Sequence, residues 1–230
     1  PEIVDLQALL RSMGARVNGA GGSIITVEGG AALHGCTHRV IGDRIVCATY
    51  LCAAAAAGGE VRLTGVDYRA VSTVALSLAE SGCEVRSEAD AVSLRSTGAL
   101  RSVRPVRTAP YPGFPTDAQP VLMAALLRSE GCTVFVENIF ENRYRHVDEL
   151  SRMGAEIRVA GRVAVVNGVR TLHGAAVKCT DLRGGAALVI AGLSAEGTTR
   201  VTELTHIDRG YDAIERDLAA LGAQIRRETT

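Results

Sequence analysis

One acidic residue stands where the sequence makes the backbone rigid. Asp117 follows Thr116 near the end of residues 109–119 (APYPGFPTDAQ), a segment with three prolines in eleven residues. Proline fixes φ, so this approach is stiff and non-helical, and it leads into the apolar run AQPVLMAALL. A carboxylate held rigidly at a helix end can act as a general base. It can also cap the helix, which is worth about 1 kcal/mol, and the residues alone favour the cap.

The arginines are the second group that could carry chemistry. All but one of the 25 basic residues are Arg, the side chain suited to a planar, bidentate grip on carboxylates and phosphates. Arg143 and Arg209 precede amphipathic segments, with Arg69 as their counterpart earlier in the chain, and Arg183 opens an apolar segment. Helix N-termini favour anions, so arginines gathered there would suit a phosphorylated or carboxylated ligand. The alternative is ordinary surface pairing with nearby carboxylates, namely Glu141, Asp148, Asp181 and Asp208.

The sequence gives little support for a metal site, a bound cofactor or disulfide bonds. His34 and His38 are four residues apart, but no helical pattern surrounds them, so we predict no metal site. No dinucleotide-binding, P-loop or nucleophile-elbow motif is present, and we predict no cofactor. The cysteines show no paired spacing and are expected to be reduced, as in a cytoplasmic protein. They are Cys36, Cys47, Cys52, Cys83, Cys132 and Cys179.

The composition of the chain limits the classes of binding partner that we expect. Lys+Arg and Asp+Glu are equal at 25 each, and the chain has no Trp, so nothing favours a nucleic acid. No apolar run reaches the length of a membrane span, and the first residues do not resemble a signal peptide. We therefore expect neither a nucleic-acid nor a membrane partner.

The chain repeats itself, and the repeat predicts the elements that must position these residues. The phrases SMGARV, ESGCEV, RMGAEI and ALGAQI recur, and their glycines (14, 82, 154 and 222) are separated by 68, 72 and 68 residues. In the same register, Asp43, Asp117 and Asp181 each open an apolar run. Each unit has the order helix, strand, helix, strand, strand: a helix apolar all round, then a second helix with one apolar face. That face comprises Val71, Val74, Ala75 and Leu78 in one unit, and Ile214, Leu218 and Leu221 in another.

Three helices that are apolar on all sides must be buried. All three are shielded from water if they pack together at the centre of the domain, with sheets and amphipathic helices outside them. We therefore predict a pseudo-threefold α/β domain over residues 41–230. Residues 1–40 are expected to be the tail of a truncated first domain, with a helix at 4–13 and strands at ARV and SIITVE.

Four phrases together resemble one family. FPTDAQ (114–119), IFENRYRHVDELSRMGA (139–155), TDLRGGAALVIAGL (180–193) and HIDRGY (206–211) resemble the UDP-N-acetylglucosamine 1-carboxyvinyltransferases. The resemblance covers essentially the whole chain and implies the enolpyruvyl transferase fold, an inside-out α/β barrel of repeated units. It implies transfer of the enolpyruvyl group of phosphoenolpyruvate to the 3′-hydroxyl of UDP-N-acetylglucosamine, with release of phosphate. This is the first committed step of peptidoglycan synthesis, a cytoplasmic reaction needed for cell-wall biogenesis, cell shape and division.

The resemblance also implies roles for individual residues. Asp117 would be the base or proton-shuttling carboxylate, with Thr116 beside it at the sugar nucleotide, and Ile139 would contact the sugar nucleotide too. Arg209, also counted as catalytic, would face phosphoenolpyruvate. Further substrate contacts would come from Arg183 at phosphoenolpyruvate, and from Arg143 and Asp181 at the border of the closed site.

Part of the family's machinery has no counterpart in the sequence. The family's Lys–Asn pair and its loop with a Cys or Asp proton donor are expected in a missing N-terminal half, so no cysteine here is predicted to be catalytic. Tyr111 stands where many relatives have His. We expect the chain alone to be inactive. The alternatives are a non-catalytic paralogue or fragment that binds a sugar nucleotide and, less favoured, another enolpyruvyl or cyclase enzyme on the same fold.

Overall fold

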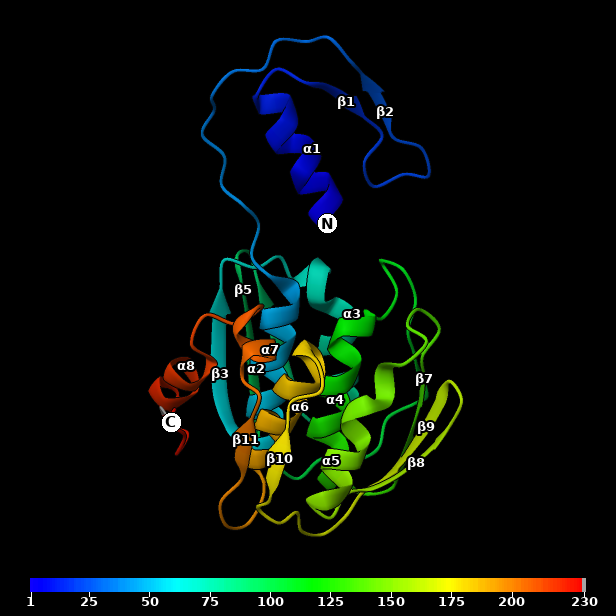
Figure 1. The fold of residues 1–230 in the computed structure, drawn as a ribbon, viewed down its shortest axis with the longest axis vertical. Coiled ribbons are helices and arrows are strands. Elements are labelled where there is room, and N and C mark those ends of the chain that lie inside the picture. The colour runs from blue at the N-terminus through cyan, green and yellow to red at the C-terminus, as the bar shows by residue number, and fades with distance from the viewer. Residues whose placement is uncertain (229–230) are drawn as a thin grey trace. The chain divides into compact units, whose positions relative to one another are not determined.

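A computed structural model describes residues 1–228. The chain separates into two compact units, Pro1–Asp43 and the part from Arg44 onwards (Figure 1). The first unit contains α1 (Glu2–Ser12) followed by β1 (Arg16–Asn18) and β2 (Thr26–Glu28). The two strands pair antiparallel, and α1 buries none of its residues within this unit. The predicted helix and both predicted strands of this segment are therefore present.

Three buried helices form the centre of the second unit. They are α2 (Arg44–Ala57), α4 (Gln119–Ala125) and α6 (Leu182–Leu193), and each contacts the other two. All seven residues of α4 are buried, as are most residues of the other two helices. Helix α4 is extended by the short 3-10 helices η1 (Thr116–Ala118) and η2 (Leu126–Arg128). The predicted cluster of apolar helices is confirmed, because these runs have no polar face to present to water.

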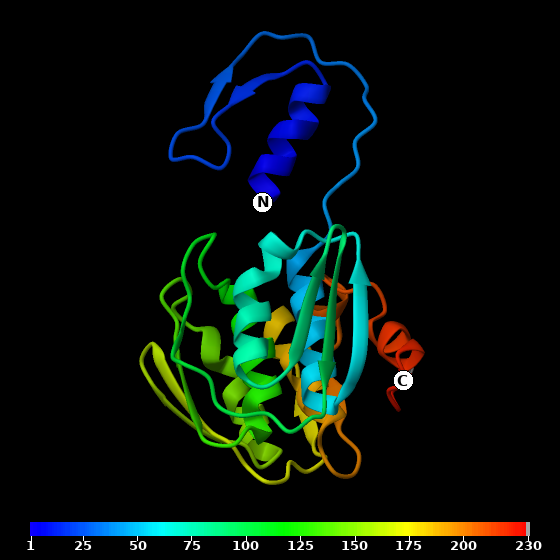
Figure 2. The same cartoon turned by 180° about the vertical axis from the view of Figure 1, so that it is seen from behind.

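Two larger β-sheets flank this helical centre (Figures 1 and 2). The first sheet has the order β3-β5-β4 and is antiparallel throughout. Its strands are β3 (Gly59–Thr64), β4 (Glu84–Glu88) and β5 (Ala91–Ser96). The face of β5 that carries Val92 and Leu94 is buried against α2 and its neighbours. Alternation of apolar and polar residues therefore sets which side of the sheet meets the core.

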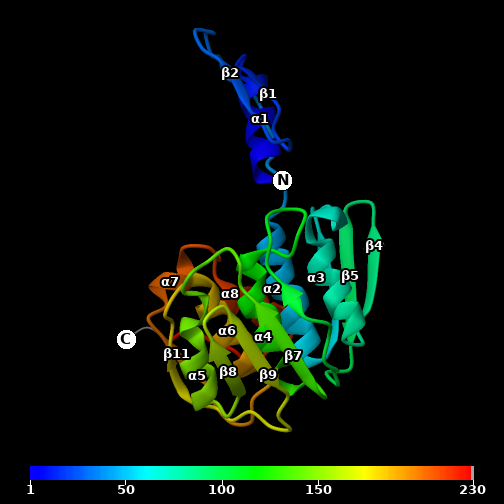
Figure 3. The same cartoon turned by 90° about the vertical axis from the view of Figure 1, so that its right-hand side faces the viewer.

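The second sheet has the order β6-β7-β9-β8, with β6 parallel to β7 and the other pairs antiparallel (Figure 3). Its strands are β6 (Val106–Arg107), β7 (Cys132–Val136), β8 (Glu156–Ala160) and β9 (Val163–Asn167). A separate parallel pair joins β10 (Ala176–Lys178) to β11 (Arg200–Thr202). The β7 strand ends next to the segment that carries Arg143, and it therefore helps to position that side chain.

The amphipathic helices lie outside the buried three. In α3 (Tyr68–Glu80) the four predicted core residues are the four that are buried. The others are α5 (Val147–Arg152), which follows the 3-10 helix η3 (Arg143–His146), then α7 (Thr205–Asp208) and α8 (Ile214–Ala220). Helix α8 buries Ile214 and Leu218, but Leu221, predicted on the same face, is 56% exposed because the helix ends before it. The four repeated glycines follow their helices with φ between +91° and +109°, where a side chain would be strained.

The third repeat departs from the predicted order. Its buried helix α6, its strand β11 and its outer helix α8 are in place, but residues 223–228 form no strand. A strand exists only where its backbone is hydrogen-bonded to another strand, and these residues have no such partner among residues 1–228. The two closing strands are thus seen in the first two repeats and not in the described part of the third.

Candidate active site

A carboxylate held by two arginines forms the centre of the candidate site. Arg143 Nη2 donates to Asp117 Oδ1 at 2.8 Å, and Arg183 Nε lies 3.3 Å from Asp117 Oδ2. The second contact is electrostatic rather than a well-aligned hydrogen bond, because Arg183 Nε has no hydrogen-bond partner among the described residues. The arginine side chains are only 7% and 12% exposed, whereas Asp117 is 39% exposed. The carboxylate is thus the part of this cluster that solvent, or a ligand, can reach.

Asp117 does not cap a helix. Neither η1 nor α4 has a side-chain hydrogen bond at its N-cap, and the residues in that position are Pro115 and Ala118. The capping interpretation that the residues alone favoured is therefore wrong for this position. The surface-pairing interpretation of Arg143 and Arg183 is also wrong, because both are nearly buried and share one carboxylate that lies far from them in sequence.

Arg143 is fixed from several directions. Its Nε and Nη2 both donate to Thr116 Oγ1 at 3.1 Å, in addition to the bond to Asp117. The guanidinium carbon lies 4.5 Å from the centre of the Phe140 ring, a cation–π arrangement. Because Arg143 opens η3 directly after this loop, the phrase FENR brings the stacking ring and the guanidinium to the same place.

Arg183 connects the buried helices at their N-terminal ends. It lies in the first turn of α6, and its Nη1 donates to the Tyr211 hydroxyl at 3.3 Å. That hydroxyl shares a hydrogen bond of 2.8 Å with Thr49 Oγ1 of α2. Burial opposes the charge on Arg183, but Tyr211 and Asp117 outweigh it, and the pKa of Arg183 is raised. The positive ends of α2 and α6 therefore lie close to a permanently charged guanidinium, a setting that favours anions.

Asp181 has a structural task at the start of α6. Its Oδ1 accepts from the backbone N–H groups of Arg183 (3.1 Å) and Gly184 (2.9 Å), so it is the N-cap. A Cβ at Gly184 would lie 2.9 Å from both Asp181 Oδ2 and His146 Cβ. The glycine here therefore permits close packing within the protein.

His146 lies beneath the site and was missed by the sequence analysis. Its side chain is fully buried, and neither ring nitrogen has a hydrogen-bond partner among the described residues. Burial lowers the pKa of His146 to about 4, against the opposing effect of the Asp181 carboxylate. The imidazole is therefore neutral at pH 7. Its only sequence signal was its position, three residues after Arg143 on the same helical stretch.

The remaining predicted residues lie outside this cluster. Ile139 is exposed and adjoins Phe140, and Arg209 is exposed at the end of α7. The Arg209 side chain makes no hydrogen bond or ion pair with any residue that the structure describes. Arg69, its counterpart in the first repeat, forms an exposed pair with Asp67 at 2.6 Å, so surface pairing holds there. The ring of Tyr111 lies 5.8 Å below the Arg44 guanidinium.

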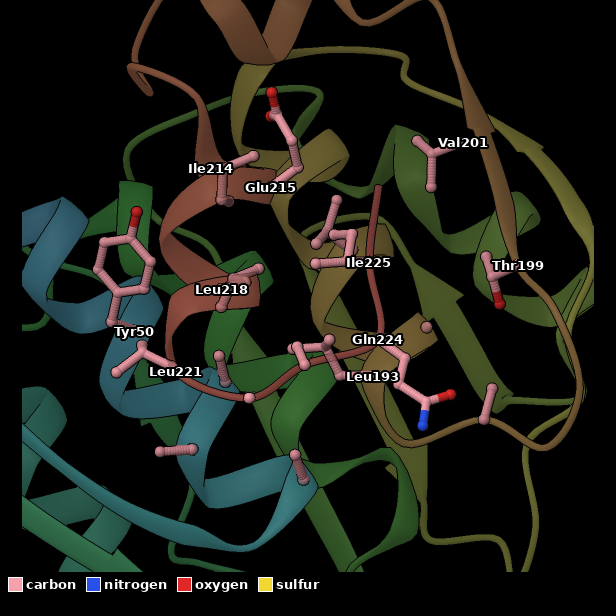
Figure 4. Close-up of a pocket in the computed structure, with 18 of the residues that line it drawn as sticks. Tyr50, Leu193, Thr199, Val201, Ile214, Glu215, Leu218, Leu221, Gln224 and Ile225 are labelled. Carbon is pink, nitrogen blue, oxygen red and sulfur yellow. The ribbon is translucent and has the colours of Figure 1, made fainter. Parts of the chain in front are cut away.

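A cavity of about 640 Å³ lies elsewhere in the second unit (Figure 4). Its lining comes from α2, α6, β11, α8 and the segment after α8, with Tyr50, Leu218 and Ile225 facing it. None of the predicted site residues lines it. Within residues 1–228, every helix is too short or too polar to cross a bilayer, and no cluster of three potential metal ligands occurs.

Comparison with known proteins identifies the family to which the chain belongs. The family model of EPSP synthase (3-phosphoshikimate 1-carboxyvinyltransferase) matches residues 1–218, and the chain belongs to this family. Within it, the chain is 52% identical over 227 residues to the UDP-N-acetylglucosamine 1-carboxyvinyltransferase of Gluconacetobacter diazotrophicus. It is 48% identical over 227 residues to UDP-N-acetylglucosamine 1-carboxyvinyltransferase 2 of Caldanaerobacter subterraneus subsp. tengcongensis. These alignments cover 99% of the chain and 54% of each relative, so the chain spans about half their length. The resemblance that the four phrases indicated is confirmed.

Solved structures agree on the fold. The enolpyruvyl transferase NikO from Streptomyces tendae matches with a TM-score of 0.78 and 29% identity, over 97% of this chain and 53% of that one. EPSP synthase from Acinetobacter baumannii matches with a TM-score of 0.73 and 20% identity, over 97% and 55% of the two chains. The predicted enolpyruvyl transferase-like α/β fold is therefore confirmed.

Proposed function

We propose that the full-length gene product transfers the enolpyruvyl group of phosphoenolpyruvate to the 3′-hydroxyl of UDP-N-acetylglucosamine. The observation that carries the proposal is the Asp117 carboxylate, accessible to a ligand and held by two nearly buried arginines. The identity of about half of the residues to proteins named for this reaction supports the choice of substrates. The reaction would place the protein in the cytoplasm, in peptidoglycan synthesis and hence in cell-wall formation and division.

This chain offers residues for deprotonation of the sugar hydroxyl and for stabilisation of the anionic transition state, but not for protonation of C3. The Asp117 carboxylate accepts the proton of the sugar 3′-hydroxyl, whose oxygen adds to C2 of phosphoenolpyruvate while C3 gains a proton. Loss of a C3 proton together with phosphate then restores the double bond. Arg183 and Arg209 offer cationic groups to the phosphate and carboxylate of phosphoenolpyruvate, and positive charge held in place lowers the energy of the anionic transition state. Thr116 borders the sugar nucleotide in this scheme.

The arrangement of the other predicted contacts is compatible with the same scheme. Ile139 presents an exposed apolar side chain to the sugar nucleotide, and Arg143 fixes the base through its hydrogen bond to Asp117. Asp181 orients the first turn of α6, from which Arg183 extends. The proton donor to C3 is a Cys or Asp of a loop that the family resemblance implies and that no residue of this chain matches. We therefore expect residues 1–230 alone to be inactive.

Release of inorganic phosphate from phosphoenolpyruvate tests the proposal. The assay is run with and without UDP-N-acetylglucosamine, on the full-length gene product and on residues 1–230. Release that requires the sugar nucleotide, by the full-length product only, is the expected result. If the folded full-length product binds UDP-N-acetylglucosamine but releases no phosphate, the transferase proposal fails and the sugar-nucleotide-binding module replaces it.

A further inference from the structure

A buried carboxylate that the proposed reaction does not use lies next to the site. Glu137 follows the end of β7 and is 1% exposed. It forms no ion pair with any described residue, and its Oε2 is buried without a hydrogen-bond partner. Removing a carboxylate from water without a cationic partner costs several kcal/mol. A buried group of this kind therefore requires a reason for its presence.

The other carboxylate oxygen organises the turn that follows. Glu137 Oε1 accepts hydrogen bonds from the backbone N–H groups of Ile139 (2.9 Å) and Phe140 (2.8 Å). It also accepts from the Thr108 hydroxyl at 2.9 Å. The same hydroxyl accepts from the Asn138 N–H at 2.8 Å. The backbone N–H groups of three successive residues, 138–140, therefore point inward at two buried acceptors, the Thr108 hydroxyl and the Glu137 carboxylate. Successive inward N–H groups form a concave site suited to an anion.

The N–H groups of Ile139 and Phe140 point inward, whereas the side chains of these two residues are exposed. Ile139 and Phe140 are two of the large apolar side chains that the structure leaves exposed. Phe140 lies over the Arg143 guanidinium, which in turn bonds to Thr116 and Asp117. A continuous set of contacts thus runs from the Glu137 carboxylate through the turn to the candidate base.

We propose that Glu137 is a positioning residue: its buried carboxylate holds the turn that presents Ile139 to the sugar nucleotide and sets the Phe140 ring over Arg143. The inference rests on the proposed function for the identity of the ligand. Glu137 does not touch the reacting atoms in this account. It acts through the two side chains that its hydrogen bonds orient, and its effect falls on binding of the sugar nucleotide.

The test is Glu137→Gln in the full-length gene product. Gln keeps the shape and an acceptor oxygen but loses the charge, and hydrogen bonds to charged groups are roughly twice as strong as neutral ones. We expect the Kd for UDP-N-acetylglucosamine, measured by calorimetry, to rise about tenfold, while the KM for phosphoenolpyruvate changes less than about twofold. Amide hydrogen exchange at Ile139 and Phe140 should accelerate about tenfold as well.

The matched control is Glu80→Gln. Glu80 is also a carboxylate that accepts a backbone N–H, from Arg104 at 2.7 Å, and it contacts none of the site residues. The Glu80→Gln substitution should leave the Kd for UDP-N-acetylglucosamine and the amide hydrogen exchange at Ile139 unaltered. If Glu137→Gln fails to fold, Glu137→Asp keeps the charge and retracts it by one methylene, and the same two measurements apply.

The outcomes separate the inference from the proposed function. Faster exchange together with a selectively weaker Kd for the sugar nucleotide supports the positioning role. Faster exchange with an unchanged Kd, or an equal loss for both substrates, overturns it and leaves Glu137 as a cap of the turn. If the unmodified full-length product binds no UDP-N-acetylglucosamine at all, the proposed function fails, and the inference about its ligand fails with it.

Discussion

Two Thr–Asp pairs precede buried helices in this molecule, and they do different things. Asp181 is a helix cap, with Oδ1 bonded to two backbone N–H groups of α6. Asp117, in the equivalent place before α4, makes no cap bond and binds two arginines from other parts of the chain. The same dipeptide therefore supports a helix in one repeat and presents a partly exposed carboxylate, paired with two arginines, in another.

The difference has a local cause in the sequence. Asp181 accepts from the N–H groups two and three residues further on, which are Arg183 and Gly184. Three residues after Asp117 stands Pro120, which has no N–H to donate. A short 3-10 turn also separates Asp117 from the start of α4. Because Pro120 has no N–H to donate, α4 loses little when the Asp117 carboxylate binds the arginines instead of capping the helix.

The largest expected effect is on activity at Asp117. Asp117→Asn keeps the size of the side chain but removes the base, and general-base catalysis typically contributes about 10²–10⁴-fold. We expect kcat for phosphate release by the full-length gene product to fall by that range. Asp67→Asn is the control, because Asp67 also bonds an arginine, and caps α3 on the surface. An Asp117→Asn enzyme within about tenfold of full activity would leave Asp117 as an ion-pair partner only.

Much of the framework around this comparison could be predicted from the sequence. The three buried helices were predictable because each run is apolar on all sides, and the α3 face because Val71, Val74, Ala75 and Leu78 recur at helical spacing. Pro120 was visible too, but its effect on a cap at Asp117 was not recognised, and the residues alone favoured the cap. The pattern of apolar residues within a segment was therefore sufficient to predict that segment's secondary structure and its buried face.

The contacts between distant elements were not predictable in the same way. Arg143, Arg183 and Asp117 converge from three separate segments, and the residues alone favoured surface pairing for such arginines. Glu137 and His146 are charged or titratable types that are rarely buried, so composition gave no reason to place them inside. The lack of a strand over residues 223–228 could not be foreseen either, because strand formation depends on a neighbour rather than on the segment itself.

The second prediction concerns how the free energy of unfolding depends on pH through His146, which lies beside the first turn of α6 that Asp181 caps. His146, which packs against Gly184 of α6, has a folded-state pKa of about 4, below the ordinary value of 6.5. The unfolded chain therefore binds a proton between these pH values that the folded chain does not. The free energy of unfolding should fall by roughly 3 kcal/mol from this group alone as the pH drops from about 6.5 to 4, and level off below that.

Urea unfolding of the protein and its His146→Leu variant from pH 7 to 4 measures this contribution. Carboxylates titrate in both proteins, so only the difference in pH dependence reports on His146. The Asp181 carboxylate favours the protonated imidazole and Arg143 disfavours it, and both are present in each protein. Parallel curves for the two proteins would contradict the buried, neutral histidine.

The smallest expected effect separates a cap from a catalytic carboxylate. Asp181→Ala removes the acceptor of two backbone N–H groups and should lower the free energy of unfolding by about 1 kcal/mol. Asp181→Asn should restore most of this loss, because Asn caps about as well as Asp. At Asp117 no cap bond exists to be lost or restored, so any advantage of Asn over Ala should come from Arg143, whose Nη2 can still donate to an amide oxygen. Unfolding curves for all four variants, with the Asp117 pair measured again in an Arg143→Ala background, test the comparison directly: an advantage of Asn over Ala at Asp117 that persists without Arg143 would mean that this carboxylate also supports α4, and the two Thr–Asp pairs would then differ in degree rather than in kind.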